Sequence, residues 1–249
     1  MKPIRAILFD SGEVLMRPIA PADAPPEQPW RKYFPGPNFE AMVQAKYPGI
    51  KLDGLDDAIL LGMEELDRLH TQPIWTPEEE VGHFDEFYRI LLDALGVSDP
   101  GLAHELARDR VYEPEIEPYP DALEILDRLH DSGLVMGVLS EAWPSLELNY
   151  SRLGLRDYFE AFIISANHGT LKDDPKLFSI AQSRMNVPAE ETLFLDDWAP
   201  YVQIAIDCGF QGAVVARDPG VPRTEGLPYI TDLTEVEELA LSRADGHPG

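Results

Sequence analysis

The sequence of 249 residues contains a single cysteine, Cys208, and few basic side chains. One cysteine excludes an internal disulfide, so we expect a reducing compartment. The apolar surroundings of Cys208, "VQIAIDCGF", predict a small core residue rather than a nucleophile. Lysine and arginine number 20 against 45 aspartates and glutamates, a formal net charge of −25. Because a surface this acidic repels phosphate backbones and anionic lipid, we expect neither nucleic acid nor a membrane as a partner.

Long apolar runs are also missing. No stretch of about 18 apolar residues is present, so the sequence predicts no membrane-spanning helix. The first ten residues, "MKPIRAILFD", lack the longer apolar region and the small-residue cleavage site of a signal peptide. We therefore expect a cytoplasmic protein. Its hydrophobic content of 44% suffices for one sizeable core, or for a core and a smaller domain.

Five short apolar runs recur along the chain, at 6–9, 134–140, 161–165, 192–197 and 212–216. They lack alternation, as expected of strands that are buried on both faces of a parallel sheet. Helical patterns lie between the later runs, at 120–133, 175–185 and 199–209. In the first of these helices, Leu123, Leu126 and Leu129 are expected to share a face, and Gly133 to end the helix. Strands that alternate with helices predict an α/β fold with a doubly wound parallel sheet.

More than a hundred residues separate the first predicted strand from the second, which is too many for a single crossover. This insertion begins in a proline-rich loop, 17–30, and continues with helical patterns at 55–70, from residue 76 onward, and at 99–111. Thr76 is a predicted N-cap, with Pro77 at the first helical position and Glu79 completing a capping box. We predict two domains, an α/β core at 1–17 and 116–249 and an inserted helical domain at 18–115.

Polar side chains follow four of the predicted strands, and sites in doubly wound folds form at the carboxyl ends of strands. They are Asp10, Ser140, Lys172, Asp196 and Asp197. Any one of them alone is ordinarily a turn former, a helix cap or a solvated side chain. Together, carboxylates at one mouth repel each other unless a cation lies among them, and a hard divalent ion such as Mg²⁺ suits oxygen ligands.

This set of groups fits one reaction well. The ion, an ammonium and a hydroxyl can hold the oxygens of a phosphate. A carboxylate can then attack phosphorus and form an aspartyl phosphate, which water hydrolyses. A strand end suits the attacking carboxylate, because it is rigid and points the side chain into the mouth of the sheet.

The stretches "FDSGEVL", "VLSEAW", "GTLKDDPKLF" and "LFLDDW" resemble, in that order, the four motifs of the haloacid dehalogenase (HAD) superfamily. The resemblance covers nearly the whole predicted sheet domain and implies a Rossmann-like HAD core, with the helical insertion similar to a C1-type cap. It implies that Asp10 is the nucleophile, that Lys172 balances the charge of nucleophile and phosphoryl group, and that Ser140, Lys172 and Ser11 bind phosphate. The implied Mg²⁺ ligands are Asp10, Gly12 through its backbone carbonyl, Asp196 and Asp197.

The first two motifs depart from the superfamily's pattern. Most phosphatases of the superfamily carry a second aspartate where this chain has Gly12, although some sugar-phosphate phosphatases share its DxGxV form. Glycine keeps the backbone carbonyl but not the general acid, whose help is typically worth about 10²- to 10⁴-fold. Glu13 is the obvious substitute acid, but the favoured interpretation is that it points away and lines the loop. Glu141 follows Ser140 where many relatives have asparagine, and a carboxylate there is unfavourable beside phosphate unless it is turned away or paired.

Side chains that flank the motifs are interpreted as structural. Trp143 and Trp198 are predicted to pack against adjoining helices rather than to wall a pocket. Asp173 is predicted to cap the turn that follows it.

Three functions are open at this stage. The favoured one is a Mg²⁺-dependent phosphatase that acts on a small phosphorylated metabolite through an aspartyl phosphate. A 2-haloacid dehalogenase, in which Asp10 displaces halide without a metal, is disfavoured because Asp196 and Asp197 oppose an anionic substrate. A non-catalytic binding or regulatory protein is the third, supported by Gly12 and Glu141. The oligomeric state is open between monomer and homodimer.

Overall fold

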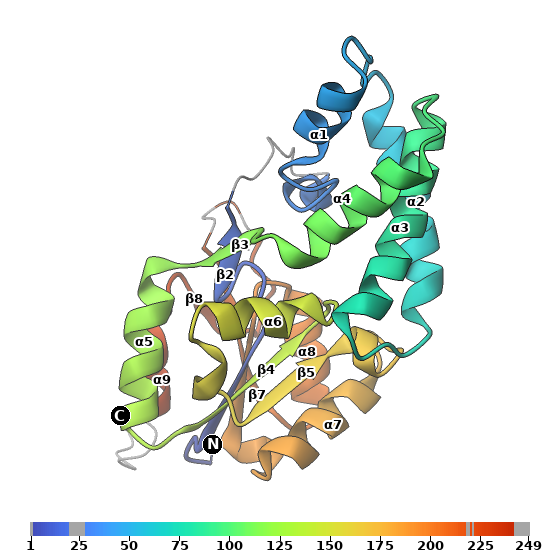
Figure 1. Cartoon of the computed structure of the whole chain (residues 1–249). Helices are drawn as coiled ribbons and strands as arrows, with labels where there is room; N and C mark the ends of the chain where they lie inside the picture. Colours follow the sequence, from blue (N-terminus) through green and yellow to red (C-terminus); the bar gives the residue numbers. More distant parts are fainter. Residues whose placement is uncertain (1, 20–27, 218–219, 221, 242–249) are drawn as a thin grey trace. The chain divides into compact units, whose positions relative to one another are not determined.

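The computed structural model describes residues 2–19, 28–217, 220 and 222–241, which divide into two units (Figure 1). The sheet unit takes its described residues from Met1–Arg17, Pro118–Ala142 and Leu146–Gly249. The helical unit takes them from Pro18–Glu117 and Trp143–Ser145. Most of the proline-rich loop predicted at 17–30 lies outside the described residues.

The sheet unit contains a six-stranded parallel sheet in the order β5-β4-β1-β6-β7-β8. Its strands are β1 (Ala6–Phe9), β4 (Val135–Ser140), β5 (Ala161–Ile164), β6 (Thr192–Asp196), β7 (Gln211–Val215) and β8 (Tyr229–Ile230). All five predicted strands are present, and the α/β prediction is confirmed. β8 is not predicted from the sequence, because a strand of two residues is too short to show a pattern.

Helices cover both faces of this sheet (Figure 1). They are α5 (Pro120–Asp131), α6 (Ser145–Arg152), α7 (Pro175–Met185), α8 (Ala199–Asp207) and α9 (Thr234–Leu241), with short 3-10 turns η2 (Arg156–Tyr158), η3 (Ser165–Asn167) and η4 (Ala189–Glu191). Ala6 and Leu8 of β1 join the core cluster that contains the buried residues of α7. Phe9, one position on, contacts Phe159 edge-on at 6.3 Å on the other face. The alternation shows why β1 is apolar throughout: both of its faces are covered.

The predicted face of α5 is correct for Leu126 and Leu129, which are buried, and wrong for Leu123. Leu123 is 45% exposed, whereas the buried residues are Ala122, Ile125, Leu126 and Leu129. These four follow the i, i+3, i+4, i+7 spacing of an amphipathic helix, and Leu123 falls outside that stripe. Gly133 lies just past the helix with φ +78°, as predicted for its end.

The helical unit is built from η1 (Pro29–Lys32), α1 (Phe39–Lys46), α2 (Leu55–His70), α3 (Pro77–Ala94) and α4 (Pro100–Tyr112). The predicted capping box is present: Thr76 Oγ1 accepts from the Glu79 N–H at 3.3 Å, and the Glu79 carboxylate accepts from the Thr76 N–H at 3.0 Å. Short strands β2 (Met16–Pro18) and β3 (Ile116–Pro118) pair where the chain passes between the units. None of the described helices has the length and apolar character needed to cross a membrane.

A buried carboxylate ties residues 143–145 to the helical unit. Glu80 of α3 is buried, and its two oxygens accept from the Ser145 N–H at 2.7 Å and the Ser145 hydroxyl at 2.6 Å. Burial raises the pKa of Glu80 to about 7, and the bonds from Ser145 only partly oppose that rise.

Gly62 of α2 permits the close approach of α3. A Cβ at Gly62 would lie 2.6 Å from Cδ2 of the buried Phe87, so Gly62→Ala should destabilise the protein by about 1–3 kcal/mol. Gly82 of α3 has nothing within 4 Å of an added Cβ. Gly82→Ala should therefore stabilise by up to about 1 kcal/mol, the ordinary helix-propensity gain. Denaturant unfolding of the two variants measures both signs, and shifts in the same direction would contradict this account of the packing.

Glu80 makes the stability of the protein pH-dependent. Its pKa of about 7 in the folded protein lies above the usual glutamate pKa of 4.5, so the folded state binds this proton more tightly than the unfolded chain. That contribution is fully present below about pH 4.5 and is lost as the pH rises through about 7. Relative to wild type, Glu80→Gln should gain on the order of 2–3 kcal/mol between pH 4.5 and 8. Unfolding free energies measured across this range give the difference, and a flat difference would show that Glu80 does not titrate in it.

Candidate active site

The strand ends predicted from the sequence meet at one edge of the sheet. Asp10 directly follows β1, Ser140 is the last residue of β4, and Asp196 is the last residue of β6. Phe9 pairs with Leu195 in the parallel register, and the Asp10 N–H donates to the Leu195 carbonyl at 2.8 Å. Asp10 and Asp196 therefore occupy corresponding positions on neighbouring strands.

Lys172 joins these two carboxylates from the loop between η3 and α7. Its Nζ lies 2.6 Å from Asp196 Oδ2 and 3.0 Å from Asp10 Oδ1, and its side chain is only 3% exposed. Burial by itself lowers the pKa of Lys172, but the charges of Asp10 and Asp196 outweigh it and hold the pKa above its usual value. Lys172 is thus a permanent cation beside Asp10 and Asp196.

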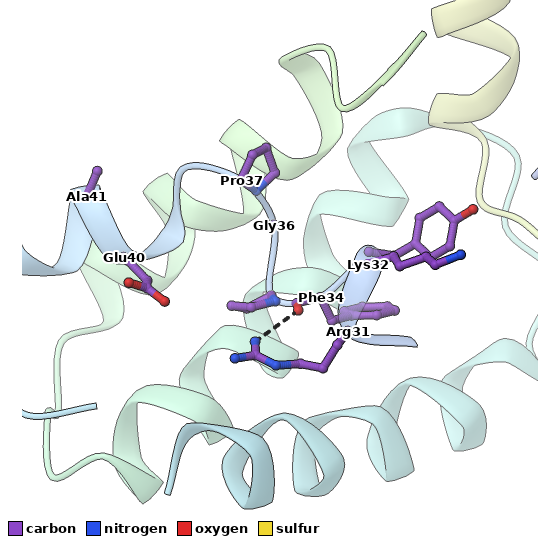
Figure 2. Close-up of a pocket in the computed structure, with 9 residues that line it drawn as sticks. Arg31, Lys32, Phe34, Gly36, Pro37, Glu40 and Ala41 are labelled. Carbon is purple, nitrogen blue, oxygen red and sulfur yellow. Dashed lines mark hydrogen bonds between the residues drawn. The ribbon is translucent and has the colours of Figure 1, made fainter. Parts of the chain in front are cut away.

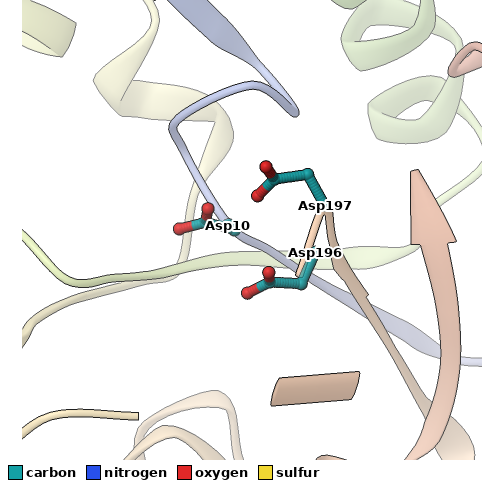
Figure 3. Close-up of side chains that lie close together, drawn as sticks. All are labelled: Asp10, Asp196 and Asp197. Carbon is teal, nitrogen blue, oxygen red and sulfur yellow. The ribbon is translucent and has the colours of Figure 1, made fainter. Parts of the chain in front are cut away.

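A third carboxylate completes the cluster. Asp10, Asp196 and Asp197 each offer an oxygen, and these oxygens lie within 4.8 Å of one another (Figure 3). Burial raises the pKa of Asp197 to about 8, with the charges of Asp10 and Asp196 adding to the effect. Burial also raises the pKa of Asp196, while Lys172 opposes it. Crowded carboxylates in a partly desolvated place resist ionisation unless a cation joins them.

The cluster fits a divalent metal ion by its donor set. All of its side-chain donors are carboxylate oxygens, which are the ligands that Mg²⁺ prefers. Asp10 Oδ1 is buried and, among the described residues, forms an ion pair with Lys172 but no hydrogen bond. When all three carboxylates are ionised, they and one ammonium carry two net negative charges, the number that one divalent ion neutralises.

The loop after β1 is held by two tyrosines. Ser11 is buried, and its Oγ lies 2.9 Å from the hydroxyl oxygen of Tyr150, so this side chain already has a partner. Gly12 forms an isolated bridge with Met16. Glu13 adopts φ +56°, and its Oε2 accepts from the Tyr119 hydroxyl at 2.8 Å. A left-handed conformation is unfavourable for glutamate, so the turn is maintained by its surroundings.

Both oxygens of Glu141 are engaged. Oε1 accepts from the Lys172 backbone N–H at 2.7 Å, and Oε2 accepts from the Tyr201 hydroxyl at 3.0 Å. The carboxylate next to Ser140 is thus paired, which is one of the two conditions that the sequence set for tolerating it beside phosphate. The ring centroid of Tyr201 also lies 4.8 Å from Lys172 Nζ. The sequence analysis did not identify Tyr201, because its partners are distant in sequence.

Three flanking residues were predicted with mixed success. Trp143 packs edge-on against Phe84 at 5.6 Å within the helical unit, as expected of a packing residue. Trp198 is 58% exposed, so the prediction that it packs against a helix is wrong. Asp174, not Asp173, caps α7, because its carboxylate accepts from the Lys176 N–H at 2.9 Å. Cys208, predicted as a core residue, is only partly buried against the α7 core cluster.

A pocket of about 290 Å³ lies elsewhere, in the helical unit, lined by residues 31–37, 40 and 41 (Figure 2). Arg31 Nη1 donates to the Phe34 carbonyl at 3.3 Å, and its Nε lies 2.9 Å from Asp56 Oδ1. Its charge is therefore already matched. None of the predicted site residues lines this pocket, so it is separate from the carboxylate cluster.

Comparison with known proteins agrees with the four sequence motifs. A family model described as a haloacid dehalogenase-like hydrolase matches residues 4–209. Glyceraldehyde 3-phosphate phosphatase of Methanopyrus kandleri is 26% identical over 202 residues, covering 78% of this chain and 76% of that protein. An (S)-2-haloacid dehalogenase of Pseudomonas fluorescens is 26% identical over 137 residues, covering 55% of this chain and 60% of that protein.

Solved structures confirm the fold. The L-2-haloacid dehalogenase of Xanthobacter autotrophicus aligns with a TM-score of 0.64 at 21% identity, covering 96% of this chain and 99% of that one. At this identity the likeness shows the α/β HAD fold and nothing finer.

The strain at position 13 can be measured directly. Glu13→Ala and Glu13→Gly both remove the acceptor of the Tyr119 hydroxyl, so their difference isolates the backbone. Because φ is +56°, the glycine variant should be more stable than the alanine variant by about 1 kcal/mol. The same pair at Glu124, in the middle of α5, should show the opposite order by a similar amount. Unfolding midpoints that favour alanine at both positions would refute the strain.

Proposed function

This chain belongs to the haloacid dehalogenase-like hydrolase family, and from that premise we propose that it is a Mg²⁺-dependent phosphatase of a small phosphorylated metabolite. One observation carries the proposal: Asp10, Asp196 and Asp197 converge while Lys172 supplies one positive charge. Such a cluster attracts a divalent cation. Without a bound cation, the excess of carboxylates over the single ammonium repels an anionic substrate.

Each residue has a proposed role. Asp10 is the nucleophile, placed at a rigid strand end, and its attack on phosphorus forms an aspartyl phosphate that water hydrolyses. Lys172 balances the charge of Asp10 and of the phosphoryl group and binds a phosphoryl oxygen, and Ser140 and Ser11 are the further proposed phosphate ligands. Ser11 can bind phosphate through its backbone N–H, and also through its hydroxyl when the Tyr150 hydroxyl is the donor in the bond between the two side chains.

The proposed ligands of Mg²⁺ are Asp10, Asp196, Asp197 and the backbone carbonyl of Gly12. When bound, the ion supplies neutralisation of the phosphate's charge and of the carboxylates that surround it. In the structure the Lys172 ammonium contacts Asp10 and Asp196, so it neutralises part of their charge in addition to the proposed ion.

Gly12 limits which esters react quickly. It brings no acid to the leaving group, and Glu13, the substitute considered from the sequence, is bonded to Tyr119. Esters whose leaving groups need little protonation should therefore react faster than alkyl esters. The helical unit is the proposed cap.

The relatives' names include both phosphatases and haloacid dehalogenases. Haloacid chemistry is the weaker candidate for this chain, because a 2-haloacid is anionic and the three carboxylates outnumber the single ammonium of Lys172 unless a cation joins them. A phosphate ester that arrives with Mg²⁺ does not meet that repulsion.

Hydrolysis of a panel of small phosphomonoesters tests the proposal. Wild type should release phosphate with Mg²⁺ and lose activity in EDTA, and Asp10→Asn should lower kcat by about 10³-fold or more, because it removes the nucleophile. An activated aryl phosphate should react about 10²-fold or more faster than an alkyl phosphate, reflecting the acid absent from position 12.

Asp207→Asn, a matched change at the exposed C-terminal end of α8, is the control and should keep wild-type activity. Halide release from 2-haloacids, with no phosphate release from any ester, would make the protein a dehalogenase. Mg²⁺ binding by calorimetry without turnover of either substrate class would favour the binding protein.

A further inference from the structure

The contacts of Lys172 with the site depend closely on the position of its ammonium. Its ammonium contacts Asp10 and Asp196 at once, at 3.0 and 2.6 Å, so a small shift of its backbone breaks one contact or both. The residue lies in a loop, between η3 and α7, and loops are the parts of a fold that move most. Something must therefore hold this loop in register with the ends of β1 and β6.

Glu141 makes two contacts with the surroundings of Lys172. Its Oε1 accepts from the Lys172 backbone N–H at 2.7 Å, which fixes the point from which the side chain departs. Its Oε2 accepts from the Tyr201 hydroxyl at 3.0 Å, and the ring centroid of Tyr201 lies 4.8 Å from Lys172 Nζ. One carboxylate thus fixes the start of the lysine side chain and the aromatic ring beside its end.

The partners come from three different elements. Glu141 directly follows β4, Lys172 precedes α7, and Tyr201 lies in the first turn of α8. Hydrogen bonds to a charged acceptor are about twice as strong as neutral ones, and a cation is attracted to the face of an aromatic ring. The hydrogen bond from the Lys172 backbone N–H to Glu141 therefore links the end of β4, which carries Ser140, to the loop that carries Lys172.

We propose that Glu141 is a positioning residue that, together with Tyr201, aligns Lys172 on Asp10 and Asp196. The inference rests on the proposed function for its catalytic consequence, but its structural part stands on the contacts alone. Glu141 does not touch the reacting atoms in this account. It acts through Lys172. Its two carboxylate oxygens accept hydrogen bonds from the Lys172 backbone N–H and the Tyr201 hydroxyl, so its charge is paired and does not repel phosphate.

Three variants separate these contacts. Glu141→Ala removes both acceptors, whereas Glu141→Gln keeps an oxygen for the Lys172 N–H and an amide that can donate to the Tyr201 hydroxyl oxygen. Tyr201→Phe keeps the ring and removes one bond. The matched control is Glu235→Ala in α9, where a carboxylate likewise accepts from a backbone N–H and a hydroxyl, both of Thr231.

Hydrogen–deuterium exchange of the peptide that contains Lys172 tests the structural part of the proposal, and this measurement needs no substrate. Exchange should be faster in Glu141→Ala and unchanged in Glu141→Gln and Glu235→Ala. Unchanged exchange in Glu141→Ala would overturn the inference, whatever the activity. All variants are compared below their unfolding midpoints, so that global unfolding does not contribute.

Steady-state kinetics read the catalytic part. Glu141→Ala should lower kcat by about 10- to 100-fold, with a smaller change in KM, because misplacement of a positioned group acts mainly on the reacting geometry. Glu141→Gln should retain most of the activity, Tyr201→Phe should fall between, and Glu235→Ala should match wild type. Equal losses in the alanine and glutamine variants, or faster exchange with unchanged kcat, would overturn the positioning role. A wild type that hydrolyses no phosphate ester would refute the proposed function and the catalytic part, while exchange still decides the structural part.

Discussion

The contact of one ammonium with two carboxylates is the constraint on which the site depends. Lys172 is almost fully buried between Asp10 and Asp196, and a buried charge is tolerable only when it is paired. The pairing fixes how far apart the two aspartates can lie. It also leaves three carboxylates around a single ammonium, and this excess of carboxylates is the physical basis for expecting a divalent ion.

The parallel sheet makes this arrangement possible. Because β1 and β6 are neighbours in register, the residues that follow Phe9 and Leu195 necessarily lie side by side. Both strands are buried on their two faces, so their ends are rigid while the residues just beyond them are polar. An acidic chain can therefore concentrate charge at one edge of the sheet, where β1 and β6 end.

The sequence predicted the features that depend on near neighbours. Strand positions, the capping box at Thr76 and the polar residues at strand ends follow from local patterns, and the structure contains them. Leu123 was misplaced because three leucines at equal spacing look like one face, whereas the buried stripe of α5 starts one residue earlier. Trp198 was misplaced because exposure depends on what lies opposite, which no single segment encodes.

Glu141 shows most clearly where local patterns end. From the sequence alone Glu141 is an unfavourable charge beside a proposed phosphate site, because its neighbours in the chain do not show which groups pair with it. Its partners are 31 and 60 residues away, and only the fold brings them within hydrogen-bonding distance. Once paired, the same carboxylate is no longer a source of repulsion but a connection between the loops of Ser140 and Lys172. A residue that departs from a family pattern is thus better judged by the donors around it than by the residue it replaces, because satisfied hydrogen bonds determine whether a partly buried charge opposes binding or orders the site.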